Sequence, residues 1–124
     1  MNESTTVVAD RQAIEQVIQQ YISGGISGRA DDMRSAFHQG ATIFGYLGPE
    51  FIGGPIQGLF DWVDQNPPAT GLQGAIASID IGETVALARL ELDNWGGHRF
   101  TDMFTLLKVD GEWKIISKVF HLHA

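Results

Sequence analysis

The chain contains no cysteine and few basic residues, and both shortages exclude classes of function. Without cysteine it can form no disulfide, no thiolate nucleophile and no cysteine-containing zinc site. Its 8 Lys and Arg stand against 15 Asp and Glu, and the net charge of -7 disfavours nucleic acid and anionic membranes as partners. No apolar run approaches the roughly 20 residues that span a bilayer, and the first residues lack the segments of a signal peptide. We therefore expect a cytoplasmic protein, bacterial by default, that binds neither nucleic acid nor membrane.

Apolar residues are plentiful enough to build a core. Hydrophobic residues make up 44% of the 124 positions, a content that argues against disorder. A chain of this length buries roughly two-thirds of its unfolded surface as one domain. We expect residues 1–124 to form a single domain.

Helical spacing dominates the front of the chain and strand patterns dominate the rest. The expected helices begin near Asp10 and end at Gly24-Gly25, span 30–37, and run from Pro55, as first helical residue, to about residue 65. The expected strands span 41–47, 51–52, 72–80, 84–94, 98–109 and 113–121. Helices placed before consecutive antiparallel strands indicate an α+β fold, in which a curved antiparallel sheet wraps around the N-terminal helices.

Asp110-Gly111 predicts a β-hairpin, because a type I′ turn needs φ > 0 at both central residues. A two-residue turn sets Val109 opposite Glu112 and Asp102 opposite Val119. Because side chains alternate across a strand, one hairpin face is expected to carry Phe100, Asp102, Phe104, Leu106, Trp113, Ile115, Ser117, Val119 and His121. The opposite face carries Arg99, Thr101, Met103, Lys114, Ile116, Lys118, Phe120 and Leu122. That second mixture of apolar and charged side chains is typical of an interface with a polar rim, so we expect a homodimer.

The connection at Gly96-Gly97 allows two registers. A two-residue turn alone places Arg89, Glu91 and Asp93 on the face of Asp102. A bulge shifts the register by one and places Leu90 and Leu92 there instead. We expect the apolar wall, because unpaired buried charges are costly.

Two segments resemble a known superfamily. They are Phe37-His38 with Ala41-Thr-Ile-Phe-Gly-Tyr46, and the run from Phe100 to His121 with its pattern Leu-Lys-x-x-Gly-x-Trp-Lys-Ile-x-x-Lys-Val-Phe. Over nearly its whole length the chain resembles the nuclear transport factor 2-like superfamily of SnoaL-like and cystatin-like cones, and within it the lumazine-binding branch. Members include ketosteroid isomerase, scytalone dehydratase, polyketide cyclases and binding modules. The resemblance implies a cone with an internal pocket and leaves the reaction open.

Asp102 is the strongest candidate for chemistry. Phe100 and Phe104 flank it, and burial among apolar groups raises the pKa of a carboxyl toward the range useful for acid–base catalysis. The alternative is a structural carboxylate that accepts hydrogen bonds from Ser117, an arginine or the backbone. The candidate catalytic residues are Asp102, His38 and His121. The candidate ligand-binding residues are Tyr46, Trp62, Trp95, Phe100 and Phe104, with plain packing as the alternative for Tyr46 and the two tryptophans.

These residues favour a small, partly apolar ligand and proton-transfer chemistry such as isomerisation, dehydration or cyclisation. The alternative is a non-catalytic ligand-binding or dimeric scaffolding module. His98, His121 and His123 come together if the hairpin register extends, and three imidazoles can hold zinc or nickel. No supporting residues are evident around them, so we expect neither a metal nor a cofactor.

Overall fold

The computed structural model describes residues 3–124. The helical elements are α1 (Glu3–Ser27), the 3-10 turns η1 (Ala30–Asp32) and η2 (Arg34–Ala36), and α2 (Gln57–Gln65). The strands are β1 (Phe37–Leu47), β2 (Glu50–Pro55), β3 (Gln73–Gly82), β4 (Val85–Trp95), β5 (His98–Val109) and β6 (Glu112–Leu122).

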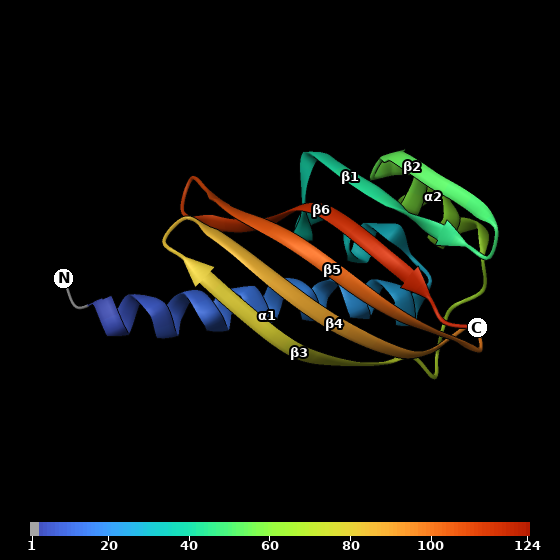
Figure 1. Ribbon diagram of the computed structural model, residues 1–124, viewed down its shortest axis with the longest axis horizontal. Helices are drawn as coiled ribbons and strands as arrows, with labels where there is room; N and C mark the ends of the chain where they lie inside the picture. The colour runs from blue at the N-terminus through green and yellow to red at the C-terminus, as the bar shows by residue number, and fades with distance from the viewer. Residues whose placement is uncertain (1–2) are drawn as a thin grey trace.

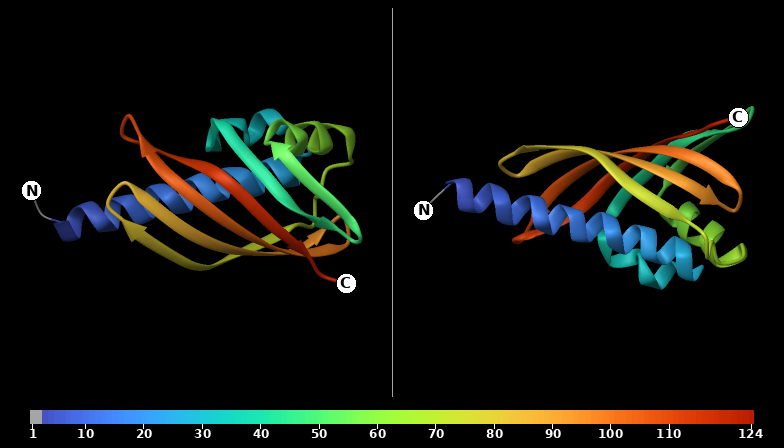
Figure 2. Two further views of the ribbon diagram at one scale, coloured as in Figure 1. Left: turned by 45° about the horizontal axis from the view of Figure 1, so that its top comes forward. Right: turned by 90° about the horizontal axis from the view of Figure 1, so that it is seen from below.

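The strands form one six-stranded sheet in the order β2-β1-β6-β5-β4-β3. All neighbours are antiparallel except β1 and β6, which run parallel. The sheet curves over α1, and the η turns and α2 lie on the same side of it (Figures 1 and 2). This arrangement confirms the predicted α+β fold with a curved sheet around the helices, and it gives the sheet an inner face toward the helices and an outer face away from them.

The first helix continues through the glycine pair that was expected to end it. At Gly24 a Cβ atom would lie 2.6 Å from the Cβ of Met33, and at Gly25 one would lie 2.9 Å from the Trp95 ring. The two glycines therefore serve close packing against α1 rather than termination. The helix ends at Gly28, whose φ of +71° is accessible to glycine at little cost and whose N–H bonds the Gly24 carbonyl at 3.0 Å.

Two further expectations about local structure need correction. Residues 30–37 form two 3-10 turns instead of one helix, and Phe37 already belongs to β1. Pro55 ends β2 instead of opening the next helix, which begins at Gln57. The short hairpin partner expected at residues 51–52 is confirmed as part of β2.

The β5–β6 hairpin has the predicted turn but not the predicted register along its whole length. Val109 pairs with Glu112 and Leu106 with Ile115, as expected, and then a bulge at Ile116 shifts the pairing by one residue. Asp102 therefore lies opposite Phe120 rather than Val119. Since the shift reverses the faces beyond the bulge, Lys118, Phe120 and Leu122 turn inward, while Ser117, Val119 and His121 turn outward.

The β4–β5 hairpin combines the two-residue turn with a bulge. Trp95 pairs with His98 across Gly96-Gly97, and the register then shifts before Leu92 pairs with Phe100. Asn94 takes a positive φ of 63° at this irregularity. Leu90 and Leu92, both fully buried, consequently lie beside Asp102 and Phe100, which confirms the apolar wall.

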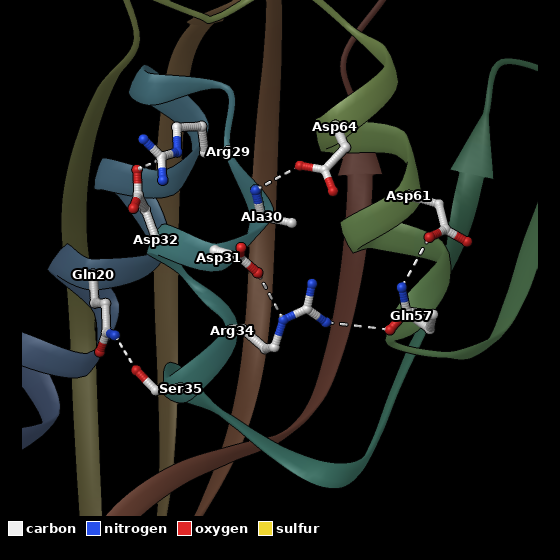
Figure 3. A network of polar contacts seen from close by, with 10 residues as sticks. All are labelled: Gln20, Arg29, Ala30, Asp31, Asp32, Arg34, Ser35, Gln57, Asp61 and Asp64. Carbon is white, nitrogen blue, oxygen red and sulfur yellow. Dashed lines mark hydrogen bonds and ion pairs between the residues drawn. The ribbon is translucent and has the colours of Figure 1, made fainter.

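A network of polar contacts joins the η turns to α2 (Figure 3). The Ala30 N–H donates to Asp64 Oδ1 at 2.9 Å, and Arg34 Nη1 donates to Gln57 Oε1 at 3.3 Å. The Arg34 guanidinium also lies 4.6 Å from the centre of the Phe60 ring. These contacts hold α2 against the rest of the fold, and α2 forms one wall of an internal cavity.

Candidate functional site

A cavity of about 180 Å³ lies between the inner face of the sheet and the two α-helices. Every layer of the fold contributes to its wall. The lining residues are Tyr21, Ile43, Leu47, Ile52, Gly58, Leu59, Trp62, Trp95, Phe100, Lys118 and Phe120. Ten of these eleven are uncharged, and most of those ten are apolar, so the wall suits a small and largely apolar molecule.

The charged member, Lys118, forms a buried cluster with two other side chains. Its Nζ lies 4.0 Å from Oδ1 of Asp102, and the Tyr21 hydroxyl donates a 2.7 Å hydrogen bond to Oδ2 of the same carboxyl. Asp102 and Tyr21 are fully buried, and Lys118 is 6% exposed. The Lys118 Nζ also lies 5.4 Å from the Tyr21 ring and 5.0 Å from the Phe120 ring. We refer to Tyr21, Asp102 and Lys118 as the cavity triad.

Asp102 is incompletely satisfied. Among the described side chains, those of residues 7–124, and the described backbone, no donor makes a hydrogen bond to its Oδ1. A buried carboxylate oxygen without a donor is costly, and Asp102 stands out in this respect among the described residues. Such a group fits a site that exchanges protons better than one that only supports the fold.

Burial shifts the pKa of each triad member toward the neutral form. Burial raises the pKa of the Asp102 carboxyl, although the charge of Lys118 and the hydrogen bond from Tyr21 oppose the shift. Burial lowers the pKa of the Lys118 ammonium, and the charge of Asp102 opposes that shift. The pKa of the Tyr21 hydroxyl rises well above 10.0 because of burial and the adjacent Asp102, so the hydroxyl stays protonated and donates.

Because burial raises the pKa of Asp102 and lowers that of Lys118, the two pKa values lie closer together than those of an exposed carboxyl and an exposed lysine. A lysine amine and a carboxyl whose pKa values approach each other can exchange a proton at small cost. Lys118 borders the cavity, whereas Asp102 lies directly behind it. The arrangement can therefore present either an amine or an ammonium group to a bound molecule, with Asp102 as its proton partner.

Several of the predicted site residues do meet at this cavity. Trp62, Trp95 and Phe100 line it, and the rings of Trp62 and Trp95 lie 6.0 Å apart. Phe104 lies one layer deeper, where its ring packs edge-to-face against Tyr21 at 5.4 Å.

Three predicted site residues lie elsewhere. His38 is exposed at the start of β1, and its Nδ1 accepts a hydrogen bond from the Gly40 N–H at 2.9 Å. Tyr46 is 57% exposed on the outer sheet face beside Phe51. His121 lies on the same outer face, 4.7 Å from His123, so the expectation that it shares a face with Asp102 was wrong. The bulge at Ile116 is the reason.

Two members of the triad were not predicted from the sequence, for different reasons. Lys118 was assigned to the outer face because nothing in the chain marks the position of the bulge. Tyr21 lies within the first expected helix and was not named as a candidate site residue. Its hydroxyl was an available signal, since a tyrosine on a buried helical face needs a hydrogen-bond partner.

The described part of the chain, residues 3–124, offers neither a metal site nor a membrane-spanning helix. Among the side chains of residues 7–124, no group of three or more His, Asp or Glu is arranged to hold a metal ion. Over the whole described range, helices are too short or too polar to cross a membrane.

A curved six-stranded sheet over a long helix, with an apolar cavity between them, defines the nuclear transport factor 2-like class of folds. Residues 9–121 match the model of a family described as "Putative lumazine-binding", and the chain belongs to that family.

Three relatives illustrate the likeness. The chain is 33% identical over 102 residues to the aldolase FrzH of a Cladobotryum species, which covers 82% of each chain. A nuclear transport factor 2-like protein of unknown function from Methylobacillus flagellatus is 48% identical, covers 94% of each chain and superposes with a TM-score of 0.91. A similar protein from Shewanella baltica is 45% identical, covers 94% of this chain and 96% of its own, and has a TM-score of 0.90.

Proposed function

We propose that this protein is an enzyme that moves a proton next to the carbonyl group of a small, largely apolar molecule held in the cavity. One observation carries the proposal: a buried lysine–carboxylate pair, 4.0 Å apart, at the wall of an otherwise uncharged cavity. Isomerisation, dehydration, cyclisation and aldol chemistry all begin with such a proton transfer. Burial of two ionisable groups costs stability, which favours a functional reason for their presence.

Each triad member has a distinct role in this proposal. Lys118 is the catalytic residue, because it borders the cavity and its amine can take a proton from the substrate. Asp102 is a positioning residue that acts through Lys118, since its charge sets the pKa of the amine. Tyr21 holds Asp102 in place through the 2.7 Å hydrogen bond. The rings of Trp62, Trp95 and Phe100 provide the apolar surface that binds the substrate, as expected for them from the sequence. Lys118 takes the catalytic role expected of His38 and His121, and Tyr46 has no role in this proposal.

One relative and the family description bear on this proposal. The Cladobotryum relative is named an aldolase, and aldol chemistry requires removal of a proton beside a carbonyl. The family description refers to lumazine, a flat heterocycle with ring carbonyl groups. Both descriptions share a carbonyl group, which an amine in the cavity wall can meet.

Deuterium exchange tests the proposal without knowledge of the natural substrate. We would incubate the protein with cyclohexanone or 3-phenylpropanal in heavy water, in a buffer free of amines, and follow deuterium at the carbon beside the carbonyl by mass spectrometry. We expect exchange above the buffer rate, and we expect Lys118→Met to lose about 100-fold or more, the contribution of a positioned general base. Lys114→Met is the matched control, because Lys114 lies on the same strand but donates to the Ser35 carbonyl outside the cavity.

Asp102→Asn distinguishes a positioning role from a merely structural one. The charge of Asp102 raises the pKa of Lys118, so its removal should move the pH profile of exchange to lower pH. Asp10→Asn is the control, because Asp10 is a second buried carboxylate paired with a lysine, Lys108, outside the cavity. Binding of the carbonyl compounds without any exchange would refute the enzymatic proposal in favour of a non-catalytic binding module.

We also propose that the protein is a homodimer that associates through the outer face of the sheet. Phe44, Val119 and Met103 are adjacent across β1, β6 and β5, and they are 40%, 48% and 46% exposed. Adjacent exposed apolar side chains on one face are typical of an interface. This patch replaces the one expected from sequence, because Phe120 and Lys118 point inward. The cytoplasmic location expected from the sequence likewise stays a prediction.

A further inference from the structure

We infer that Lys118 is a covalent nucleophile, whose amine forms an iminium with the carbonyl carbon of a small apolar aldehyde or ketone bound in the cavity. The inference rests on the proposed function and names its substrate class and its intermediate. It concerns bond formation at Nζ, whereas proton transfer alone requires no covalent step.

Lys118 differs from the other two lysines of the chain in where its side chain lies. Lys108 is engaged with Asp10 at 2.9 Å, and Lys114 donates to the Ser35 carbonyl at 2.6 Å. Both retain partly exposed side chains, at 31% and 26%. Lys118 borders the cavity with a side chain 7% exposed, and its nearest carboxylate oxygen, at 4.0 Å, lies beyond hydrogen-bond distance. Its amine is therefore the one placed to meet a molecule in the cavity.

The surroundings of Lys118 favour the neutral amine, which is the form that attacks a carbonyl. The groups around Nζ are two aromatic rings, at 5.0 and 5.4 Å, and one carboxyl. Burial lowers the pKa of this lysine, and desolvation of this kind is how enzymes activate a lysine for Schiff-base chemistry. Asp102 and Tyr21 are the titratable groups that face it.

Iminium formation balances with the groups present. The Lys118 ammonium first gives a proton to Asp102. The Nζ lone pair then attacks the carbonyl carbon, the C=O electrons move to oxygen, oxygen takes the proton held by Asp102, and Nζ gives Asp102 a second proton. The resulting hydroxyl takes this second proton from Asp102, the C–O bond breaks, water leaves and the Nζ lone pair forms the C=N bond. The net reaction joins the ammonium form of Lys118 and the carbonyl compound to give an iminium and water, with no oxidant or reductant.

The cavity wall also narrows the class of carbonyl compound. Lys118 contributes the one charged side chain to the lining, and it is the group consumed in the covalent step. No second cation in the lining is left to bind a phosphate or carboxylate on the substrate. The remaining wall is dominated by aromatic and aliphatic side chains such as Trp62, Trp95 and Leu59. Small aldehydes and ketones with hydrocarbon or aromatic bodies are therefore favoured over phosphorylated sugars.

Reductive trapping tests the inference. The protein is incubated with 3-phenylpropanal and sodium cyanoborohydride, which reduces an iminium to a stable secondary amine, and the product is mapped by peptide mass spectrometry. We expect one adduct per chain, with the mass of the aldehyde less its oxygen, on Lys118. Labelling should reach its half-maximal rate at a pH below the value of about 10.4 typical of an exposed lysine. Lys118→Arg and Lys118→Met should both abolish it, whereas Lys108→Arg and Lys114→Arg should not.

The outcomes separate this inference from the proposed function. Adducts spread over Lys108, Lys114 and the N-terminus in proportion to their exposure would overturn the inference. Deuterium exchange that depends on Lys118 without a trapped adduct would also overturn it, while the proton-transfer function stands. A Lys118 adduct without exchange in any carbonyl compound would support the covalent site and refute the proposed turnover. Circular dichroism of each variant confirms that a loss of labelling does not reflect unfolding.

Discussion

The hydroxyl group of Tyr21 offers a direct measure of how the buried carboxyl is stabilised. Tyr21→Phe removes the donor of the 2.7 Å hydrogen bond to Asp102 and leaves the ring, which packs against Phe37, Trp95 and Phe104. The variant therefore changes one polar contact in an otherwise intact core. Both oxygens of Asp102 would then lack a donor, since Oδ1 has none among the described side chains and backbone.

The size of the loss should depend on pH. A hydrogen bond to a charged group contributes about 1.5–3 kcal/mol, and one between neutral groups about 0.5–1.5 kcal/mol. Because burial raises the pKa of Asp102 in the folded protein, the carboxyl favours folding most at low pH, and that contribution is lost as the pH rises through the folded-state pKa. Tyr21→Phe raises this pKa further. We expect it to cost about 1 kcal/mol below the pKa of Asp102 and about 2 kcal/mol or more above it.

Urea denaturation followed by tryptophan fluorescence, at pH values from about 4 to about 8, measures the difference. Tyr46→Phe is the matched control: Tyr46 is the second tyrosine of the chain and is 57% exposed, so its loss should stay within about 0.5 kcal/mol. In an Asp102→Asn background the pH dependence of the Tyr21→Phe loss should disappear. An equal loss at every pH in the parent background, or no loss at all, would refute the idea that Tyr21 stabilises an ionisable Asp102.

Three other variants test the core, the second buried carboxylate and the outer face. Trp113→Ala should cost about 3–5 kcal/mol, because Trp113 is 3% exposed, and an unshifted melting temperature would contradict its place in the core. Hydrogen bonds from Lys108 and Trp113 lower the pKa of Asp10 below 3.8, so the stability it contributes is present above that value and lost as the pH falls through the folded-state pKa. Asp10→Asn should accordingly flatten the acid limb of a stability–pH curve, and an unchanged acid limb would count against this pairing. Met103→Glu should convert the proposed dimer into monomers in sedimentation velocity runs, whereas a parent protein that is already monomeric at high micromolar concentration would remove the dimer proposal.

The fold follows largely from local patterns. The Asp110-Gly111 turn and the length of β5 were predicted correctly, because turn chemistry and β-branched residues act over a few neighbouring positions. The end of α1 was not predicted correctly, because Gly24 and Gly25 pack against residues outside the helix, Met33 and Trp95. Whether a glycine ends a helix or admits a neighbour depends on tertiary contacts that periodicity does not contain.

The site was predictable only in part for a related reason. Asp102 followed from its apolar neighbours on the strand, and Trp62 and Trp95 were among the expected ligand-binding residues. Lys118 could not follow, because its face depends on the bulge at Ile116 and the local sequence is compatible with a regular strand as well. A buried carboxyl needs a polar partner, so one was to be expected for Asp102. Which residue it is depends on the register of β5 and β6, which the sequence did not reveal.

The bulge at Ile116 determines which of two alternating sets of β6 side chains faces the cavity. As folded, β6 presents Lys118 and Phe120 to the cavity, and His121 to the outside. A regular strand with the same sequence would present Val119 and His121 instead, exchanging an amine for an imidazole beside Asp102. A one-residue insertion or deletion between the Asp110-Gly111 turn and the cavity is thus enough to turn a different side chain of β6 toward the cavity. No residue of β6 beyond that point needs to be substituted. Relatives aligned position by position can therefore share the residue corresponding to Lys118 and still differ in the chemistry their cavities offer.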